Sequence, residues 1–419
     1  MHLTLTDADI LAQVRDHFKA GPPTRIGVAV SGGGDSIALL HILHRCFNPD
    51  AVTLNAVTID HGLRPEAADE ARQVADFCES LGVTHSTLRW RGWDGTGNLQ
   101  DQARRARYEL LGDWARMHKV SVVALGHTAD DQAETVLMRL GRAAGVTGLA
   151  AMPPRRTAHG VVLSRPMLSL TREQLRSYLR THQLRWIDDP SNDDLQFDRI
   201  KARQALTVLE PLGITAQSLA LVAGNMQQAR DALDWYSFLA ANDIAQVNGG
   251  DILLDHRHFR TLPEEIARRL ISQAVTWIGG SEYAPRRSAM TTVLDAARSR
   301  KSATLNGCQV VHHGANIWIC REFNAVRKTR CAVDRLWDGR WRLQGANIDG
   351  CELRPLGRRG LMHCAEWRGT GRPHASLTAS PAVWRGDELV AAPLAGYPEG
   401  WSAHLSAGSE EFFAALLTH

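Results

Sequence analysis

The sequence predicts an α/β fold. We expect an N-terminal domain built on a parallel sheet, then a helical domain and a small α+β domain at the C-terminal end. In the first 200 residues, short β-branched runs alternate with helical apolar patterns, which is typical of βαβ units. The pattern changes near Pro211, and helical segments then dominate to about Arg300. Short strands and turns follow Lys301. These changes place the domains at 1–212, 213–325 and 326–419.

Composition agrees with a folded, multidomain protein. The chain has 419 residues, of which 44% are hydrophobic and 22% charged, and a single domain usually has roughly 100–200. No apolar run approaches the roughly 18 residues that a membrane span needs. The first residues lack a basic segment followed by an apolar one. We therefore expect a cytoplasmic protein with no membrane partner.

Four strands and their following helices make up the expected sheet. Leu39, Leu40, Ile42 and Leu43 form a helical stripe after the first strand. Pro65 opens a helix over 66–81, and Asn98 caps another that runs to about His118. Two capping boxes, Thr128 with Asp131 and Thr171 with Gln174, mark later helix starts. The strands are expected at 25–30, 52–59, 83–90 and 120–125.

Later segments are simpler to assign. Apolar periodicity predicts helices over 217–241 and 263–278. The runs 309–312 and 316–320, separated by Gly314-Ala315, predict a β-hairpin.

A glycine-rich loop follows the first strand. The residues Ser31-Gly32-Gly33-Gly34-Asp35-Ser36 lie between an apolar strand and an apolar-striped helix. Glycines let backbone N–H groups approach an anion, and the helix N-terminus attracts it. The loop is therefore expected to bind phosphate. It is no Walker loop, because no Lys-Ser/Thr follows the glycines. Asp35 would repel a phosphate unless a cation lies between them, so it predicts Mg²⁺.

A second group of polar residues follows the fourth strand. His127, Asp131 and Glu134 have the spacing of one helical face. This face brings two carboxylates toward the loop, where they can hold a cation or accept a proton. Acidic residues are also common in the first turn of a helix, where they stabilise its dipole.

Charge and cysteine content add two observations. Residues 301–372 carry 13 basic and 6 acidic side chains, which fits either a phosphate-facing surface or an ordinary solvated one. The seven cysteines form no Cys-x-x-Cys pair, and buried reduced thiols are the preferred interpretation over a metal site near His312, His313 and His363.

Taken together, the motifs resemble those of tRNA(Ile)-lysidine synthases, within the ATP-pyrophosphatase (PP-loop) superfamily. Ser-Gly-Gly-x-Asp-Ser is the loop of the superfamily, and the further motifs narrow the choice over roughly residues 25–205. These motifs are Ile59-Asp60-His61-Gly62-Leu63-Arg64, Ala103-Arg104-x-x-Arg107-Tyr108, the run from Gly126 to Thr135, Arg165-Pro166-Met167-Leu168, Trp186-Ile187-Asp188-Asp189-Pro190-Ser191-Asn192 and Phe197-x-Arg199 with Arg203.

The resemblance implies an activity and its participants. ATP with Mg²⁺ would adenylate the wobble cytidine of tRNA(Ile) with a CAU anticodon, and the L-lysine ε-amine would then displace AMP. It implies catalytic roles for Asp35, Arg104 and Asp131. It also implies that Ser31, Gly32, Gly33, Gly34, Asp35 and Ser36 bind ATP, that His127 and Glu134 bind substrate, and that Asp35 and Asp131 bind the metal.

Three other functions compete with this one. A tRNA thiolase would need catalytic cysteines near the loop, and only Cys46 and Cys78 occur in the N-terminal region. An amidating synthetase would need an ammonia source, and no glutaminase with an N-terminal cysteine is visible. A non-enzymatic RNA-binding protein would not need Asp35, Asp131 and Glu134. The sequence leaves open whether the chain forms a homodimer.

Overall fold

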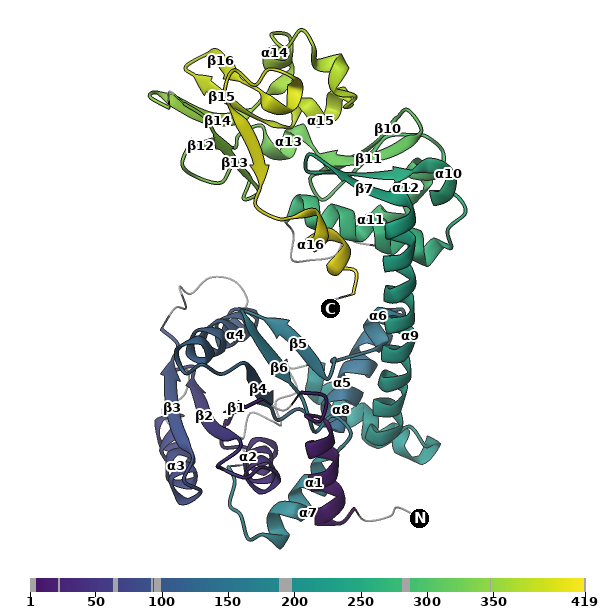
Figure 1. Ribbon diagram of the computed structural model, residues 1–419. Coiled ribbons are helices and arrows are strands. Elements are labelled where there is room, and N and C mark those ends of the chain that lie inside the picture. Colours follow the sequence, from purple (N-terminus) through teal and green to yellow (C-terminus); the bar gives the residue numbers. More distant parts are fainter. Residues whose placement is uncertain are drawn as a thin grey trace. The chain divides into compact units, whose positions relative to one another are not determined.

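The computed structural model describes residues 5–21, 23–62, 67–91, 93, 99–187, 198–280, 287–346 and 348–417, without the side chains of Gln100 and Arg287. The chain forms two compact units, Met1–Arg230 and Asp231–His419 (Figure 1). The boundary falls inside a long helix, α9 (Ala216–Ile244). The three-domain division at 212 and 325 stays a prediction. Pro65, Asn98 and residues 188–192 lie outside the described residues.

The first unit contains a six-stranded sheet in the order β3-β2-β1-β4-β6-β5. All neighbouring strands are parallel except β5, which pairs antiparallel with β6. The parallel sheet predicted from the alternating pattern is therefore confirmed. The strands are β1 (Arg25–Ala29), β2 (Thr53–Asp60), β3 (Thr84–Arg89), β4 (Val122–Leu125), β5 (Arg155–Ala158) and β6 (Val161–Ser164).

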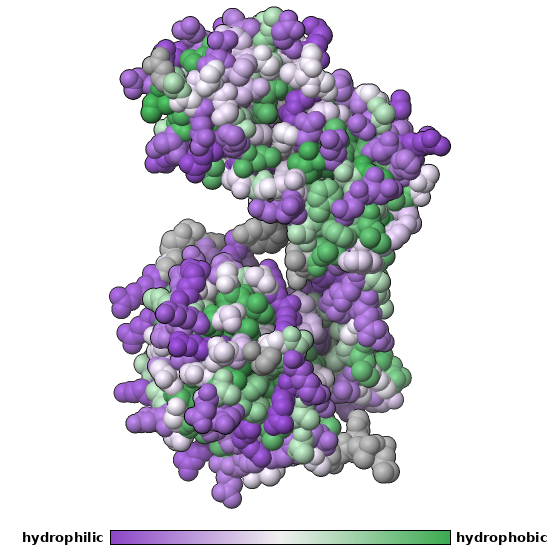
Figure 2. Space-filling model, in the orientation of Figure 1, coloured by the Kyte–Doolittle hydropathy of each residue, from purple (hydrophilic) through white to green (hydrophobic). Residues whose placement is uncertain are grey.

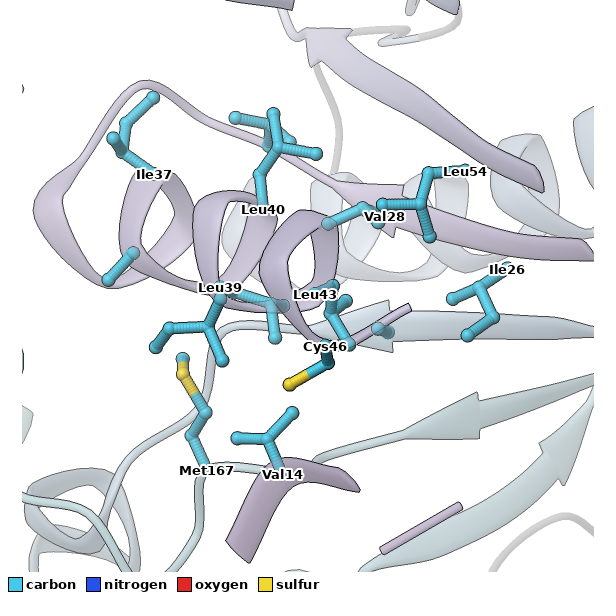
Figure 3. Close-up of a cluster of buried hydrophobic side chains, with 14 of the residues drawn as sticks. Val14, Ile26, Val28, Ile37, Leu39, Leu40, Leu43, Cys46, Leu54 and Met167 are labelled. Carbon is cyan, nitrogen blue, oxygen red and sulfur yellow. The ribbon is translucent and has the colours of Figure 1, made fainter. Parts of the chain in front are cut away.

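Helices cover both faces of this sheet. One core joins α2, α3 and α7 to β1 and β2, and Figure 3 shows its apolar contacts around Leu39, Leu40 and Leu43. A second core packs Leu111 and Trp114 of α4 against the opposite face. The helices are α1 (Asp7–Asp16), α2 (Gly34–Cys46), α3 (Ala67–Ser80), α4 (Leu99–Met117), α5 (Ala129–Leu140), α6 (Val146–Leu149), α7 (Arg172–Thr181), α8 (Asp198–Leu209) and the 3-10 turn η2 (Glu210–Leu212).

The second unit begins with a five-stranded antiparallel sheet in the order β7-β8-β11-β10-β9. The predicted hairpin is its β10–β11 pair. The other three strands were not expected, because each has only three to five residues, too few to show a clear alternation. The elements are β7 (Ala245–Asn248), β8 (Asp251–Asp255), α10 (His256–Phe259), α11 (Glu264–Gly279), α12 (Arg287–Arg298), β9 (Ala303–Leu305), β10 (Cys308–His313) and β11 (Asn316–Arg321).

The C-terminal part mixes short helices with two small sheets, β12-β14-β15-β16 and β13-β17. Trp337, Trp341 and Trp401 fill one of its cores, in agreement with the expected α+β class. Its elements are α13 (Phe323–Val326), β12 (Cys331–Ala332), β13 (Trp341–Gln344), β14 (Cys351–Pro355), α14 (Gly357–Leu361), η3 (Trp367–Thr370), α15 (His374–Thr378), β15 (Pro381–Arg385), β16 (Glu388–Ala391), η4 (Pro393–Ala395), β17 (Ser402–Leu405) and α16 (Ser409–Ala414).

The surface in view is mostly hydrophilic, with smaller apolar areas between the hydrophilic ones (Figure 2). Among the described residues, no single helix has the length and apolar content to cross a bilayer; only the bent pair Asp198–Leu212 and Ala216–Ile244 meets that test, taken together. All seven cysteines are reduced thiols, and five of them are buried.

Candidate active site

The glycine-rich loop connects β1 to α2, as the sequence predicts. Gly32 has a φ of +86°, a left-handed conformation that favours glycine. The Ser36 hydroxyl donates to the Gly33 carbonyl at 2.8 Å and accepts from the Ser31 N–H at 3.1 Å, which closes the turn. The first N–H groups of a helix have no intrahelical acceptor. The loop therefore presents backbone donors at the start of α2.

Neighbouring backbone packs tightly against the loop. A Cβ on Gly126 would lie 3.2 Å from the carbonyl carbon of Asp35 and from the Cα of Ser36. The Ile187 N–H donates to the Gly32 carbonyl at 3.0 Å. The loop is thus held in place by the segment after β4 and by the segment after α7.

A cavity of about 940 Å³ opens beside the loop. It lies at the carboxyl ends of β1, β2 and β4, where parallel sheets usually bind ligands. Three stretches of the chain contribute to its wall: residues 29–36 apart from Gly32, residues 57–61, and Gly126, His127 and Asp131 after β4. The charged side chains of the wall are Asp35, Asp60, Glu70, Asp131, Arg107, Arg172, Arg176, Arg180 and Arg203.

Asp131 serves two purposes at the start of α5. One carboxylate oxygen, Oδ2, accepts from the N–H and the hydroxyl of Thr128 at 2.9 and 3.0 Å. Together with the contact between the Asp131 N–H and the Thr128 hydroxyl, this forms the predicted capping box. The other oxygen, Oδ1, faces Arg172 at 2.6 Å. Asp131 therefore has one oxygen committed to the helix and one directed to a cation.

Arg172 ties the acidic residues together. Its guanidinium donates from Nη2 to Asp131, from Nη1 to Glu134 at 2.8 Å, and from Nε to Asp35 at 3.4 Å. Glu134 is only 1% exposed and also accepts from Nε of Arg203 at 3.1 Å. Glu134 is not part of the cavity wall, and lies beneath it behind two arginines.

The two aspartates respond to these surroundings in opposite ways. Burial raises the pKa of Asp35 to about 6, an effect that Arg172 only partly offsets. Burial is also the largest influence on Asp131 and acts to raise its pKa, but Arg172, His127, the Thr128 N–H and Arg199 together outweigh it, so the net pKa is lowered. Of these two aspartates, Asp35 is the one whose surroundings supply too little positive charge to offset its burial.

His127 lies in the same wall. Burial lowers its pKa to about 3, so the ring is neutral near pH 7. Its Nδ1 has no hydrogen-bond partner among the described residues. A neutral imidazole with an unused nitrogen can hydrogen-bond to a ligand, in keeping with its predicted role in substrate binding.

The structure places Arg107, rather than Arg104, at the cavity. Arg104 is exposed, and its guanidinium lies 5.8 Å from the centre of the Tyr108 ring. Burial lowers the pKa of Arg107, which lies in the wall. The two positions are almost one helical turn apart along α4, and of the two only Arg107 reaches the wall. The catalytic role expected for Arg104 stays a prediction.

Three arginines of α7 were not predicted as site residues. Arg172, Arg176 and Arg180 all line the cavity. The signal was available, since residues four apart share one face of a helix. A positive residue in the first helical turn is also electrostatically unfavourable, and Arg172 occupies that position directly after the Thr171 cap.

The described residues contain no cluster of three or more histidine, cysteine, aspartate or glutamate side chains that could hold a metal ion. Asp35 and Asp131 thus form at most a two-carboxylate site. Mg²⁺ usually binds through one or two carboxylates together with substrate phosphates, so this pair fits Mg²⁺ delivered with a nucleotide. In the part of the chain that the structure describes, the cysteines form no potential metal site with neighbouring histidine or acidic side chains.

A strand–loop–helix phosphate site on a parallel sheet defines a class of ATP-using proteins. The family model of the PP-loop domain matches residues 6–210 of this chain. These residues contain the sheet, the glycine loop and every charged side chain of the cavity wall.

Curated relatives show to which family of PP-loop proteins the chain belongs. A tRNA(Ile)-lysidine synthase of Ruegeria pomeroyi is 57% identical over 419 residues, covering all of both chains. The enzyme of that name from Wolbachia pipientis is 36% identical over 339 residues, covering 78% of this chain and 79% of its own. One from a Bradyrhizobium species is 40% identical and covers 60% and 74%. The chain belongs to the tRNA(Ile)-lysidine synthase family.

Proposed function

We propose that the protein joins L-lysine to C2 of the wobble cytidine in tRNA(Ile) with a CAU anticodon. ATP would first adenylate the cytidine and release pyrophosphate; the lysine ε-amine would then displace AMP. One observation carries the proposal beside the family membership: a single cavity wall combines the glycine loop, the carboxylates of Asp35 and Asp131, and five arginines. We also propose that it acts in the cytoplasm, where ATP and tRNA meet.

The loop and the arginines are suited to the triphosphate. The loop supplies backbone N–H groups, while Arg176 and Arg180 supply positive charge from one face of α7. Negative charge accumulates on pyrophosphate as it leaves, so fixed donors stabilise this step. Arg107, which reaches the wall from α4, is suited to a phosphate or to the adenylated base.

Asp35 and Asp131 are the residues that would hold Mg²⁺. A bound Mg²⁺ neutralises phosphate charge during transfer. Asp35 fits this role because burial leaves its carboxylate short of positive charge. Both carboxylates border the same cavity as the loop.

Glu134 and His127 are the proposed lysine-binding residues. A carboxylate attracts an ε-ammonium, and a nearby base must remove one proton before the amine can attack. Glu134 is fully buried, so a cation paired with it would be little screened by water. His127 is neutral and would hydrogen-bond to the substrate without repelling its charge.

Transfer of labelled lysine to RNA tests the proposal. The full-length protein is incubated with Mg²⁺-ATP, labelled L-lysine and tRNA(Ile) bearing CAU, with the same tRNA bearing GAU as the matched control. We expect label on the CAU substrate alone, together with AMP and pyrophosphate. RNA binding without ATP-dependent labelling would reject the proposal in favour of a non-catalytic RNA-binding protein.

A further inference from the structure

The strongest unexplained feature is the position of Arg172 among the acidic residues. Its guanidinium contacts three carboxylates at once, those of Asp35, Asp131 and Glu134. Its own backbone N–H donates to Oδ2 of Asp130 at 2.8 Å. The side chain is 19% exposed. A cation at the first turn of a helix interacts unfavourably with the helix dipole. The three carboxylates offset this unfavourable interaction and stabilise Arg172 at this position.

The proposed function needs the same carboxylates for other cations. Asp35 and Asp131 would hold Mg²⁺, and Glu134 would hold the lysine ε-ammonium. Asp131 has only Oδ1 to offer, because Thr128 occupies Oδ2. Oδ1 is the atom that Arg172 holds at 2.6 Å. Arg172 therefore competes with Mg²⁺ for the oxygens of Asp35 and Asp131, and with substrate lysine for those of Glu134.

A second set of partners for Arg172 lies in the same cavity. The guanidinium borders the wall that also contains the glycine loop. Guanidinium groups bind phosphate and carboxylate oxygens with similar planar geometry. A triphosphate at the loop would thus offer Arg172 an alternative to the carboxylates.

We propose that Arg172 is a positioning residue that holds these three carboxylates, including that of the lysine-binding Glu134, until ATP binds, and then moves to the phosphates. Lysine then binds well only after ATP. This inference rests on the proposed function and adds an order of binding to it. Because coupling between two binding sites is reciprocal, lysine also strengthens ATP binding by the same factor.

Lysine affinity with and without nucleotide tests this order. The probe is α,β-methylene-ATP with Mg²⁺, which cannot be cleaved between the α and β phosphates, and calorimetry reports binding to the full-length protein. For the wild type we expect the nucleotide to raise lysine affinity roughly tenfold, within the usual range of coupled sites. For Arg172→Gln we expect tighter lysine binding without nucleotide and weaker nucleotide binding. The ratio of lysine affinity with nucleotide to lysine affinity without it should then be near one.

Two further variants separate positioning from folding. In Arg172→Lys a single ammonium cannot reach three carboxylates together, so the ratio should fall partway while the melting temperature stays close to that of the wild type. Arg116→Gln removes an exposed arginine that pairs with Asp113 on α4, outside the cavity wall, and should leave the ratio unchanged.

Some outcomes would overturn the inference. If nucleotide does not change the lysine affinity of the wild type while lysine transfer to tRNA proceeds, Arg172 does not control the site and the proposed function stands. Weaker lysine binding by Arg172→Gln, with an unchanged ratio in Arg172→Lys, would reduce Arg172 to a structural residue. Absence of both lysine binding and lysine transfer would reject the proposed function itself.

Discussion

At the scale of single residues, Asp35 has an unfavourable environment. It lies in the cavity wall, where burial raises its pKa to about 6, well above the ordinary value of 3.8. A carboxyl group whose pKa is higher in the folded state stabilises that state at pH values below 3.8, the pKa of the unfolded chain. This stabilisation is lost as the pH rises through about 6, the pKa in the folded state. At neutral pH the ionised Asp35 therefore lowers the stability of the protein, which is common where function requires a charge.

Asp35→Asn should raise the stability of the protein and abolish lysine transfer. Near neutral pH we expect a gain on the order of 1–3 kcal/mol, because the amide needs no ionisation in the wall. The gain should shrink as pH falls to about 4, where Asp35 is itself neutral when folded. Thermal melts across this range measure it, and Asp16→Asn, at an exposed site paired with Lys19, is the control. A stability gain of Asp35→Asn that does not depend on pH would contradict the raised pKa of Asp35.

Sequence reasoning found part of the site at this scale. The residues from Ser31 to Ser36 and Asp131 could be predicted because local patterns fix them: a strand, a glycine turn and a capped helix. Arg172 was missed because its importance comes from contacts with residues 38 to 137 positions away. The spacing of Arg172, Arg176 and Arg180 marks one face of a helix, but no local pattern encodes which carboxylates Arg172 contacts.

At the scale of elements, α7 carries much of the site's positive charge. Its first residue contacts the carboxylates, and Arg176 and Arg180 follow along the cavity wall. Thr171 fixes where the helix starts: its hydroxyl accepts from the Gln174 N–H, and its own N–H donates to the Gln174 side chain at 2.8 Å. The cap therefore sets the position of Arg172 as well as the stability of the helix.

Thr171→Ala should destabilise the protein by about 1 kcal/mol, the usual effect of losing an N-cap. Because the start of α7 then frays, KM for ATP should also rise. Chemical denaturation and steady-state kinetics measure the two effects. Thr171→Ser keeps the hydroxyl and should restore both; if serine fails to restore them, the threonine acts through its methyl group instead.

Elements were predictable where a long pattern marked them. The four parallel strands and both capping boxes follow from apolar runs and Thr-x-x-Asp or Thr-x-x-Gln spacing. The strands β7, β8 and β9 were missed, and residues 213–325 therefore looked mostly helical. Their pairing partners in the sheet determine them more than their own sequence does.

At the scale of the whole molecule, charge is unevenly distributed between sequence regions. The excess of basic residues over 301–372 lies in the second compact unit. Arg358 and Arg359 on α14 are exposed and form no ion pair within the described part of the chain. Exposed arginines without acidic partners are suited to nucleic-acid phosphates.

Joint substitution of Arg358 and Arg359 by Gln should weaken tRNA binding and its dependence on salt. Removing one protein–phosphate interaction lowers the slope of log K against log salt by roughly 0.9, so a fall of about 2 is expected for the pair. Lysine transfer at saturating tRNA should persist. Filter binding over a series of salt concentrations measures the slope, with Lys19→Gln as control; an unaltered slope would place these arginines away from the RNA.

The cavity wall is drawn from residues as distant in sequence as Ala29 and Arg203. A nucleotide bound there would contact the carboxyl ends of three strands as well as α7 and α8. Since a ligand that binds only the native state adds RT ln(1 + [L]/Kd) to stability, a nucleotide bound in this cavity would also help to keep the first unit folded. Destabilising substitutions in this unit should therefore lower its melting temperature less when saturating nucleotide is present.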